Sequence, residues 1–167
     1  MALLPLVYFP DPRLLKKAEP VTKVDDTIRQ LVKDMIETMY HEKGAGLAAN
    51  QVGNPLHIFV MDLSEKGDQP VCAINAEIIS REGEKLDPMG CLSLPGAYGT
   101  VPRSAKLRFK ALDENGKEYE MDVEEIAAHC VEHELDHLNG KLFIHRMSSL
   151  KRERAIKQSE KFRREKE

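Results

Sequence analysis

His133-Glu134-Leu135-Asp136-His137 reads H-E-x-x-H inside a segment whose apolar residues recur with a helical period. An α-helix turns about 100° per residue, so side chains four positions apart lie on one face, one turn apart. His133 and His137 can therefore present two imidazole nitrogens to one divalent cation. Glu134 lies beside that face, where a carboxylate can move a proton of a water molecule on the metal. The stretch predicts a helix over residues 124–138 that carries the centre of a metal-dependent hydrolase.

A hydrolytic metal site usually needs a third protein ligand as well as a water molecule. The downstream candidates are poor, because Phe143 stands where the extended motif H-E-x-x-H-x-x-G-x-x-H has its last histidine. His145 comes two residues late, and Glu153 and Glu160 fall on a heavily charged segment. A hydrated helix carrying two unrelated histidines is the alternative interpretation, and a third ligand upstream would exclude it.

Cys91 is the upstream candidate, because the glycine before it lets a thiolate approach a metal closely. Cys130 lies three residues before His133 and is better suited to line a pocket. Cys72 falls in a strand pattern and is expected in the core. His129 lies four residues before His133, but a metal role is disfavoured because one cation rarely spans two full turns.

Composition predicts one soluble domain over residues 1–167. The chain is 41% hydrophobic and 32% charged, with a net charge of −3, which gives no whole-chain basic footprint for DNA. Three cysteines argue against a disulfide framework. No apolar run approaches the ~18 residues of a membrane span, and the start of the chain lacks the pattern of a signal peptide. We therefore expect a cytoplasmic protein.

Periodicity and turn signals predict the other elements. A helix is expected over 22–42. A segment of small residues follows over 44–51, where a helix end and loop is the alternative interpretation, and a polar, turn-rich segment covers 81–88. Residues 90–96 read as a small element bracketed by glycines. The predicted strands cover 56–61, 70–74, 106–112 and 119–123, and a last helix covers 148–164.

Three motifs in order resemble the signatures of the peptide deformylase family. They are Gly44-Ala-Gly-Leu-Ala-Ala-Asn-Gln51, then Gly90-Cys91-Leu92-Ser93, then the H-E-x-x-H stretch. The resemblance implies an α+β fold, with mixed or antiparallel sheets around a central metal-binding helix and a further C-terminal helix. It also implies that Cys91, His133 and His137 bind iron(II) in the cell, with zinc, nickel or cobalt as replacements.

The resemblance further implies removal of the formyl group from the N-terminal formyl-methionine of newly made polypeptides, with release of formate. Hydroxide on the metal would attack the formyl carbon, with Glu134 as general base and then general acid. The Gln51 side-chain amide and the Leu92 backbone N–H would stabilise the oxyanion. The methionine would enter a pocket formed by seven residues in the family's pattern: Gly44, Ala45, Gly46, Leu92, Ala128, His129 and Cys130.

Three positions depart from the pattern. Met89 stands where the family commonly has a glutamate that can pair with Arg103, and Asp87 is the candidate replacement partner. His129 and Tyr98 replace the apolar and basic residues found in relatives, so the peptide preference is expected to differ more than the reaction.

The C-terminal segment 148–167 contains eight Lys/Arg and four Glu, a charge of +4 that leaves −7 for the rest of the chain. It is read either as a hydrated helix or as a helix that docks on the ribosome. Two alternatives to a deformylase remain at this point. One is a metallopeptidase that cuts internal peptide bonds, and the other is a metal-bound binding module without catalysis.

Overall fold

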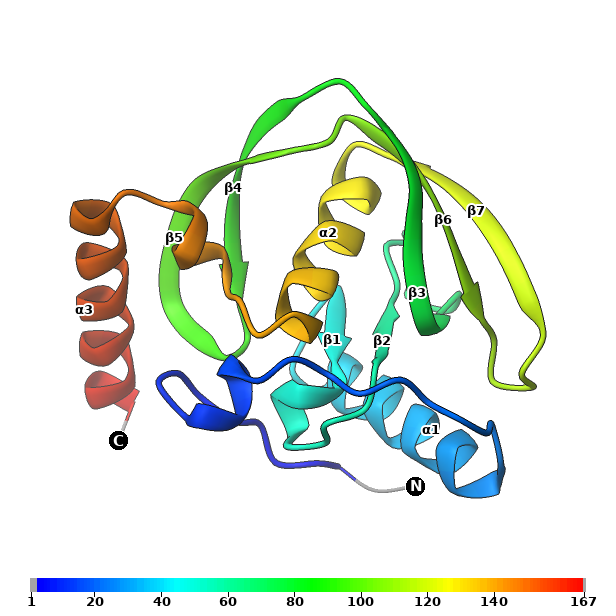
Figure 1. The fold of residues 1–167 in the computed structure, drawn as a ribbon. Coiled ribbons are helices and arrows are strands. Elements are labelled where there is room, and N and C mark those ends of the chain that lie inside the picture. Colours follow the sequence, from blue (N-terminus) through cyan, green and yellow to red (C-terminus); the bar gives the residue numbers. More distant parts are fainter. Residues whose placement is uncertain (1–2, 167) are drawn as a thin grey trace.

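A computed structural model of the chain describes residues 3–166; the side chains at 87, 89 and 166 lie outside that description. Three α-helices, seven strands and three short 3-10 helices make an α+β fold in which every strand pair is antiparallel (Figure 1). The elements follow in this order: η1 (Pro12–Leu15), α1 (Asp26–His41), β1 (Gly46–Ala48), η2 (Ala49–Val52), β2 (Ile58–Met61), β3 (Val71–Glu82), β4 (Lys85–Cys91), β5 (Leu94–Arg103), β6 (Lys106–Leu112), β7 (Glu118–Glu124), α2 (Ile126–Leu138), η3 (Phe143–Arg146) and α3 (Ser149–Lys166).

Helix α2 occupies the centre of the molecule. A five-stranded sheet in the order β1-β2-β3-β6-β7 lies on one side of it, and the β4-β5 hairpin lies on the other (Figure 1). Helix α1 packs beneath β1 and β2, and α3 packs outside β5. The predicted fold class, including the central metal-binding helix and the C-terminal helix, is confirmed.

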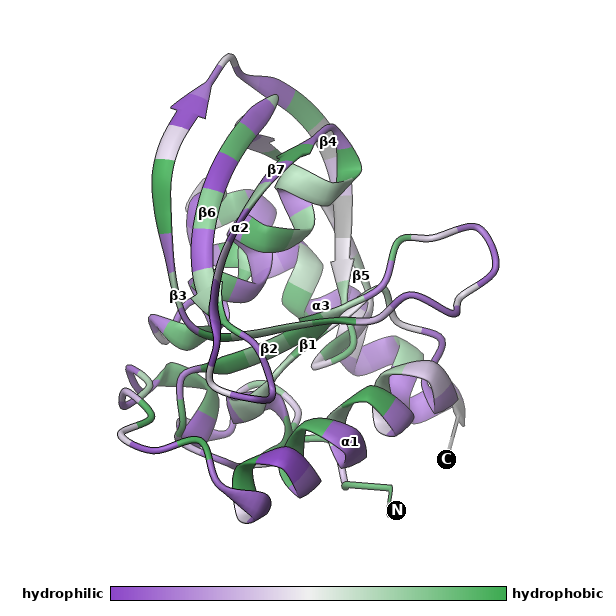
Figure 2. Cartoon of the chain, turned by 90° about the vertical axis from the view of Figure 1, so that its right-hand side faces the viewer, coloured by the Kyte–Doolittle hydropathy of each residue, from purple (hydrophilic) through white to green (hydrophobic). Residues whose placement is uncertain are grey.

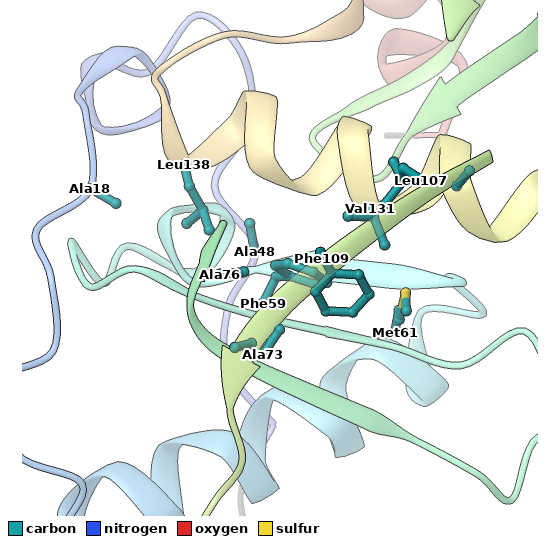
Figure 3. Packing of buried hydrophobic residues seen from close by; sticks show 12 residues of the cluster. Ala18, Ala48, Phe59, Met61, Ala73, Ala76, Leu107, Phe109, Val131 and Leu138 are labelled. Carbon is teal, nitrogen blue, oxygen red and sulfur yellow. The ribbon is translucent and has the colours of Figure 1, made fainter. Parts of the chain in front are cut away.

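The core under α2 joins the helix to the large sheet (Figure 3). Phe59 of β2 and Phe109 of β6 are fully buried there, and Val131 and Leu138 of α2 pack onto them. Strand β6 alternates buried and more exposed positions, as its sequence pattern predicts. Figure 2 shows the matching alternation of hydrophobic and hydrophilic residues along this strand. This packing fixes α2 against the sheet, so the side chains on its other faces are held in place.

Local signals explain where the helices begin and end. The Asp25 carboxylate accepts the Ile28 N–H at the start of α1, so the helix begins at Asp26 and not at residue 22 as predicted. Helix α2 ends at Leu138, and Gly140 follows with a φ of 78°. A side chain at Gly140 would meet the Leu15 carbonyl oxygen at 2.6 Å, so glycine is required both by conformation and by space.

One prediction on the middle of the chain is wrong. Residues 81–88 are not a turn-rich segment, because β3 continues to Glu82 and β4 begins at Lys85. The segment of small residues over 44–51 contains the three-residue strand β1 and most of η2. Strand β5 has no counterpart among the predicted strands. Its two inner prolines and the proline of β4 hide the pattern, and a two-stranded hairpin tolerates them because each strand has a free edge.

Candidate metal centre

Three potential ligands converge where the end of β4 meets α2. The Sγ atom of Cys91 lies 3.1 Å from Nε2 of His137, and that nitrogen lies 3.2 Å from Nε2 of His133. All three donor atoms lie within 4.8 Å of one another. His133 and His137 come from successive turns of α2, as the spacing predicts, and Cys91 is the last residue of β4. The prediction that a sulfur from mid-chain meets two ring nitrogens is confirmed.

The donor set fits a divalent transition metal. Burial lowers the pKa of His137 to about 4 and that of His133 well below its ordinary value, so both rings stay neutral and keep a lone pair for a cation. Burial, reinforced by the charge of Glu134, raises the pKa of the Cys91 thiol to about 12. A cation would therefore displace the thiol proton, as metal binding by cysteine requires. Cysteine and two histidines form a three-ligand set that leaves one position open.

The other candidates for the third ligand lie elsewhere. Among the side chains that the structure describes, which do not include that of Asp87, no other group of three His, Cys, Asp or Glu comes close enough to hold a metal. His145 accepts the Leu142 N–H through Nδ1, and Glu153 and Glu160 are exposed on α3. His129 and Cys130 belong to α2 but not to the cluster.

Glu134 is the ionisable side chain next to the cluster. It is 1% exposed, and one of its carboxylate oxygens lies 3.8 Å from Nε2 of His133. Its other oxygen, Oε2, has no hydrogen-bond partner among the described residues. Burial raises the pKa of Glu134 to about 8, against a smaller opposing effect of Arg103. A carboxylate with this pKa can both accept and return a proton near neutral pH.

Gln51 approaches the cluster from η2 with a fixed orientation. Its Oε1 accepts the Ala48 N–H at 2.9 Å, which turns the amide nitrogen toward Ser93 Oγ at 3.2 Å and Cys91 Sγ at 3.5 Å. The side chain is 1% exposed. An N–H donor is therefore held beside the ligand cluster, at a place where negative charge could develop. Leu92 directly follows Cys91 and lines the same cavity.

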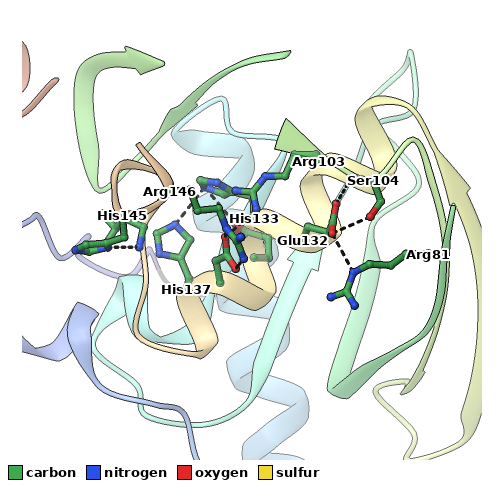
Figure 4. A network of polar contacts seen from close by, with 11 residues as sticks. Arg81, Arg103, Ser104, Glu132, His133, His137, His145 and Arg146 are labelled. Atoms are coloured by element: carbon green, nitrogen blue, oxygen red, sulfur yellow. Dashed lines mark hydrogen bonds and ion pairs between the residues drawn. The ribbon is translucent and has the colours of Figure 1, made fainter. Parts of the chain in front are cut away.

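An ion-pair network centred on the buried Asp136 ties α2 to β5 and η3 (Figure 4). Asp136, 6% exposed, accepts from Arg103 of β5 at 2.7 Å and from Arg146 of η3 at 2.6 and 2.7 Å. The sequence pattern did not predict this role of Asp136, although an acidic residue inside a buried helical motif needs a partner. The expected partner of Arg103 lay on β4, where the side chains of Asp87 and Met89 are outside the described residues.

The cluster opens into a cavity of about 1140 Å³. Of the seven residues expected around the methionine, six line it: Gly44, Ala45, Gly46, Leu92, His129 and Cys130. The structure does not bring Ala128 there, since it is fully buried in the core between α2 and the sheet. Tyr98 is 69% exposed and lines the rim.

Glycine is needed at the wall of this cavity. A Cβ atom on Gly46 would lie 2.8 Å from Cys130 Sγ and 3.2 Å from the side chain of Glu134. A Cβ on Gly44 would lie 2.7 Å from the end of the Leu92 side chain. The backbone at 44–46 can therefore lie this close to Leu92, Cys130 and Glu134 only because residues 44 and 46 are glycines.

Comparison with known proteins agrees with this geometry. Residues 3–153 match the family model described as Polypeptide deformylase. The chain is 51% identical over 162 residues to the peptide deformylase of Alkalilimnicola ehrlichii, covering 96% of this chain and 91% of that protein. It is 52% identical over 163 residues to that of Cellvibrio japonicus, covering 96% of each.

Solved structures extend the likeness to three dimensions. The crystal structure of a peptide deformylase from Legionella pneumophila superposes with a TM-score of 0.94 at 44% identity, covering 98% of this chain and 97% of that chain. The peptide deformylase of Ehrlichia chaffeensis in complex with actinonin gives 0.92 at 39% identity, covering 96% and 98%. The chain therefore belongs to the polypeptide deformylase family, as a metal-dependent hydrolase that removes the N-formyl group from nascent peptides.

Proposed function

We propose that Glu134, Gln51 and Leu92 perform this deformylation on a formyl-methionyl peptide bound in the cavity beside the Cys91–His133–His137 group. One observation carries the assignment: the Glu134 carboxylate and the Gln51 amide line one corner of the cavity together with Cys91 and His133. The third ligand, His137, lies against both of those ligands. Hydrolysis of an amide needs a nucleophilic water, a proton carrier and an oxyanion donor, and this corner offers residues for each requirement.

The resident metal is inferred to be iron(II), with zinc, nickel or cobalt able to replace it. One thiolate and two imidazoles suit iron and zinc alike. When bound, the cation supplies a Lewis acid that lowers the pKa of water and polarises the formyl oxygen. Metal analysis of protein purified without oxygen tests this inference.

Glu134 acts as the proton carrier. Its carboxylate takes a proton from the attacking water and later gives it to the nitrogen of the departing methionine. The raised pKa of Glu134 supports both directions of transfer. The buried Oε2 atom, which has no partner among the described residues, supports a role in holding water.

Gln51 and Leu92 stabilise the negative charge that develops on the formyl oxygen. The fixed amide of Gln51 supports this role, because a preorganised donor needs no rearrangement as the charge appears. The N–H of Leu92 is assigned as the second donor because Leu92 directly follows the ligand Cys91 and lines the cavity.

The substrate methionine is inferred to lie against Gly44, Ala45, Gly46, Leu92, His129 and Cys130, with Ala128 supporting this wall from the core side. The small residues at 44–46 support an extended peptide that pairs with the backbone as an added strand. Formate release from formyl-Met-Ala, measured without oxygen, tests the proposal. Cleavage of an internal peptide bond without formate release would instead favour a metallopeptidase.

Residues 1–167 are inferred to form one catalytic domain. The family match over 3–153 and the packing of α3 on β5 support this inference. Within residues 3–166, no helix is long and apolar enough to cross a bilayer. A cytoplasmic location is inferred from the nascent-peptide substrate.

Helix α3 is inferred to contact the ribosome through its basic residues, which supply a local charge of +4 within 148–167. Contacts with phosphates release counterions. The affinity for ribosomes should therefore fall by roughly 10-fold or more when the salt concentration is raised from about 50 to about 200 mM. Ribosome binding that is insensitive to salt would argue against this contact.

A further inference from the structure

The cavity extends well beyond the corner that holds the metal ligands. Its volume of about 1140 Å³ exceeds the roughly 300–1,000 Å³ of a typical small-ligand site, so a formyl-methionine alone would leave much of it free. Its far part is lined by both ends of the described chain, namely Leu6 and Tyr8 near the start and Phe162 and Arg163 of α3.

The N-terminal segment connects this far part to the catalytic residues. The Val7 N–H donates to the Gln51 carbonyl at 2.7 Å, and the Phe9 N–H donates to the Ser93 carbonyl at 2.9 Å. Tyr8 lies between these two hydrogen bonds, and its side chain lines the cavity. The residues before and after Tyr8 are thus hydrogen-bonded to Gln51 and Ser93, which lie beside the metal ligands. These two bonds fix the position of the Tyr8 ring relative to that part of the site.

Helix α3 closes the other side. A Cβ atom on Gly96 of β5 would lie 2.3 Å from Cβ of Phe162, so the helix rests directly on the strand at that point. The next residue, Arg163, places its guanidinium 4.6 Å from the centre of the Tyr8 ring. Stacking on an aromatic face holds the guanidinium in place while its N–H edges stay available to an anion.

The rim of the cavity has the character of a binding surface. Large apolar side chains that are exposed in this protein gather around it, which is typical of a groove for a ligand. Those that line the cavity are Tyr8, Leu63, Tyr98, Ile126 and Phe162.

We propose that Tyr8 and Arg163 form a distal subsite that binds the peptide substrate beyond its second residue and prefers an acidic side chain there. The proposal rests on the proposed function, because it assigns the far part of the same cavity to the same substrate. Arg163 makes no ion pair with any side chain that the structure describes, so its charge is available to a carboxylate of the peptide. The basic helix around it favours the same sign of ligand.

The test uses amidated formyl-Met-Ala peptides of six residues, in which a single Glu or Lys is moved through positions three to six of a serine background. We expect Glu to exceed Lys in kcat/KM at one or two positions by on the order of threefold to tenfold, mainly through KM. Arg163→Glu should reverse that ratio. Arg164→Glu is the matched control, because it changes the same charge on the neighbouring, exposed residue of α3 that does not line the cavity.

Binding gives a second readout that does not depend on turnover. The chain contains no tryptophan, so a C-terminal Trp-amide on each peptide reports its binding to metal-loaded Glu134→Gln protein by fluorescence anisotropy. Equal affinity for the Glu and Lys peptides at every position, or the same change in Arg163→Glu and Arg164→Glu, would overturn the subsite. Failure to release formate from formyl-Met-Ala would instead count against the proposed function, while the binding comparison still decides the subsite.

Discussion

Helices α2 and α3 both pack against strand β5, but they differ in how far their charged side chains are buried (Figure 1). Helix α2 buries Glu134 at 1% and Asp136 at 6% exposure, together with its three histidines. Helix α3 buries Ala155 and Ser159, and the side chains of most of its charged residues face solvent. Water screens the charges of α3, whereas each buried charge of α2 needs a partner or a shifted pKa. The ligand and carboxylate side chains of the site therefore lie on α2, the more deeply buried of the two helices.

The largest effect should come from removing the buried glutamate. Glu134→Ala should lower kcat by about 10²- to 10⁴-fold, because the proton carrier is lost while the three ligands remain. Formate release and metal content measured on the same sample check this outcome. Full activity with normal metal content would remove Glu134 from the mechanism.

Substitution of the buried Asp136 should lower the free energy of unfolding, and this effect is measured separately from turnover. Asp136→Asn removes the buried carboxylate to which Arg103, 3% exposed, and Arg146 both donate, so the free energy of unfolding should fall by about 3–5 kcal/mol. Urea denaturation of the metal-free and metal-loaded proteins measures the loss. A change of under about 1 kcal/mol would mean that the two arginines are stabilised by other groups.

The stability of the fold should depend on pH because of the same aspartate, Asp136. Burial alone would raise the pKa of Asp136, but the hydrogen bond from Arg146 and the charge of Arg103 outweigh it and hold the pKa below the ordinary 3.8. A carboxyl group whose pKa is lower in the folded state stabilises the fold above its unfolded pKa. Its contribution should therefore be complete above about pH 5 and disappear as the pH falls below about 4. Asp136→Asn should flatten this part of the stability profile.

The contact of α3 with β5 should give an intermediate effect. Gly96→Ala puts a Cβ atom 2.3 Å from Phe162 at a φ of +81°, whereas Gly67→Ala at a φ of +62° meets nothing within 4 Å. Both substitutions carry the strain of a positive φ, so their difference isolates the packing of α3. We expect Gly96→Ala to cost about 1–3 kcal/mol more than Gly67→Ala in thermal or urea unfolding. Equal costs would show that α3 adjusts freely over the strand.

The smallest effect should come from the outer face of α3. Glu153→Gln changes an exposed charge and should alter the free energy of unfolding by less than about 0.5 kcal/mol. It serves as the solvent-exposed counterpart of the Glu134 and Asp136 substitutions. A loss comparable to that of Asp136→Asn would contradict the contrast between the two helices.

Sequence patterns predicted the features that depend on residues close together in the sequence. The spacing of His133 and His137 fixes their common face once a helix is assumed, and the glycine before Cys91 made it the upstream ligand candidate. The strand 106–112 was predicted with its observed bounds because its alternation follows its burial. These features depend on neighbours in sequence, and the prediction needed no knowledge of distant contacts.

Long-range partners were beyond the reach of these patterns. The pairing of Asp136 with Arg103 joins residues 33 apart, and the stacking of Arg163 on Tyr8 joins the two ends of the chain. Strand β5 was missed because its prolines resemble loop signals unless its edge position is known. The expected contribution of Ala128 to the cavity illustrates the same problem, since helical position alone does not say which face a neighbouring sheet will cover.

The backbone at Gly46 also restricts how this enzyme can escape an inhibitor. Any replacement there adds an atom 2.8 Å from Cys130 and 3.2 Å from the Glu134 side chain. A substitution that would crowd out a drug therefore also crowds Glu134, the proposed proton carrier. Compounds that bind chiefly through this stretch of main chain should select few resistant variants at the position itself, and resistance should arise at the wider, more tolerant rim around Tyr98.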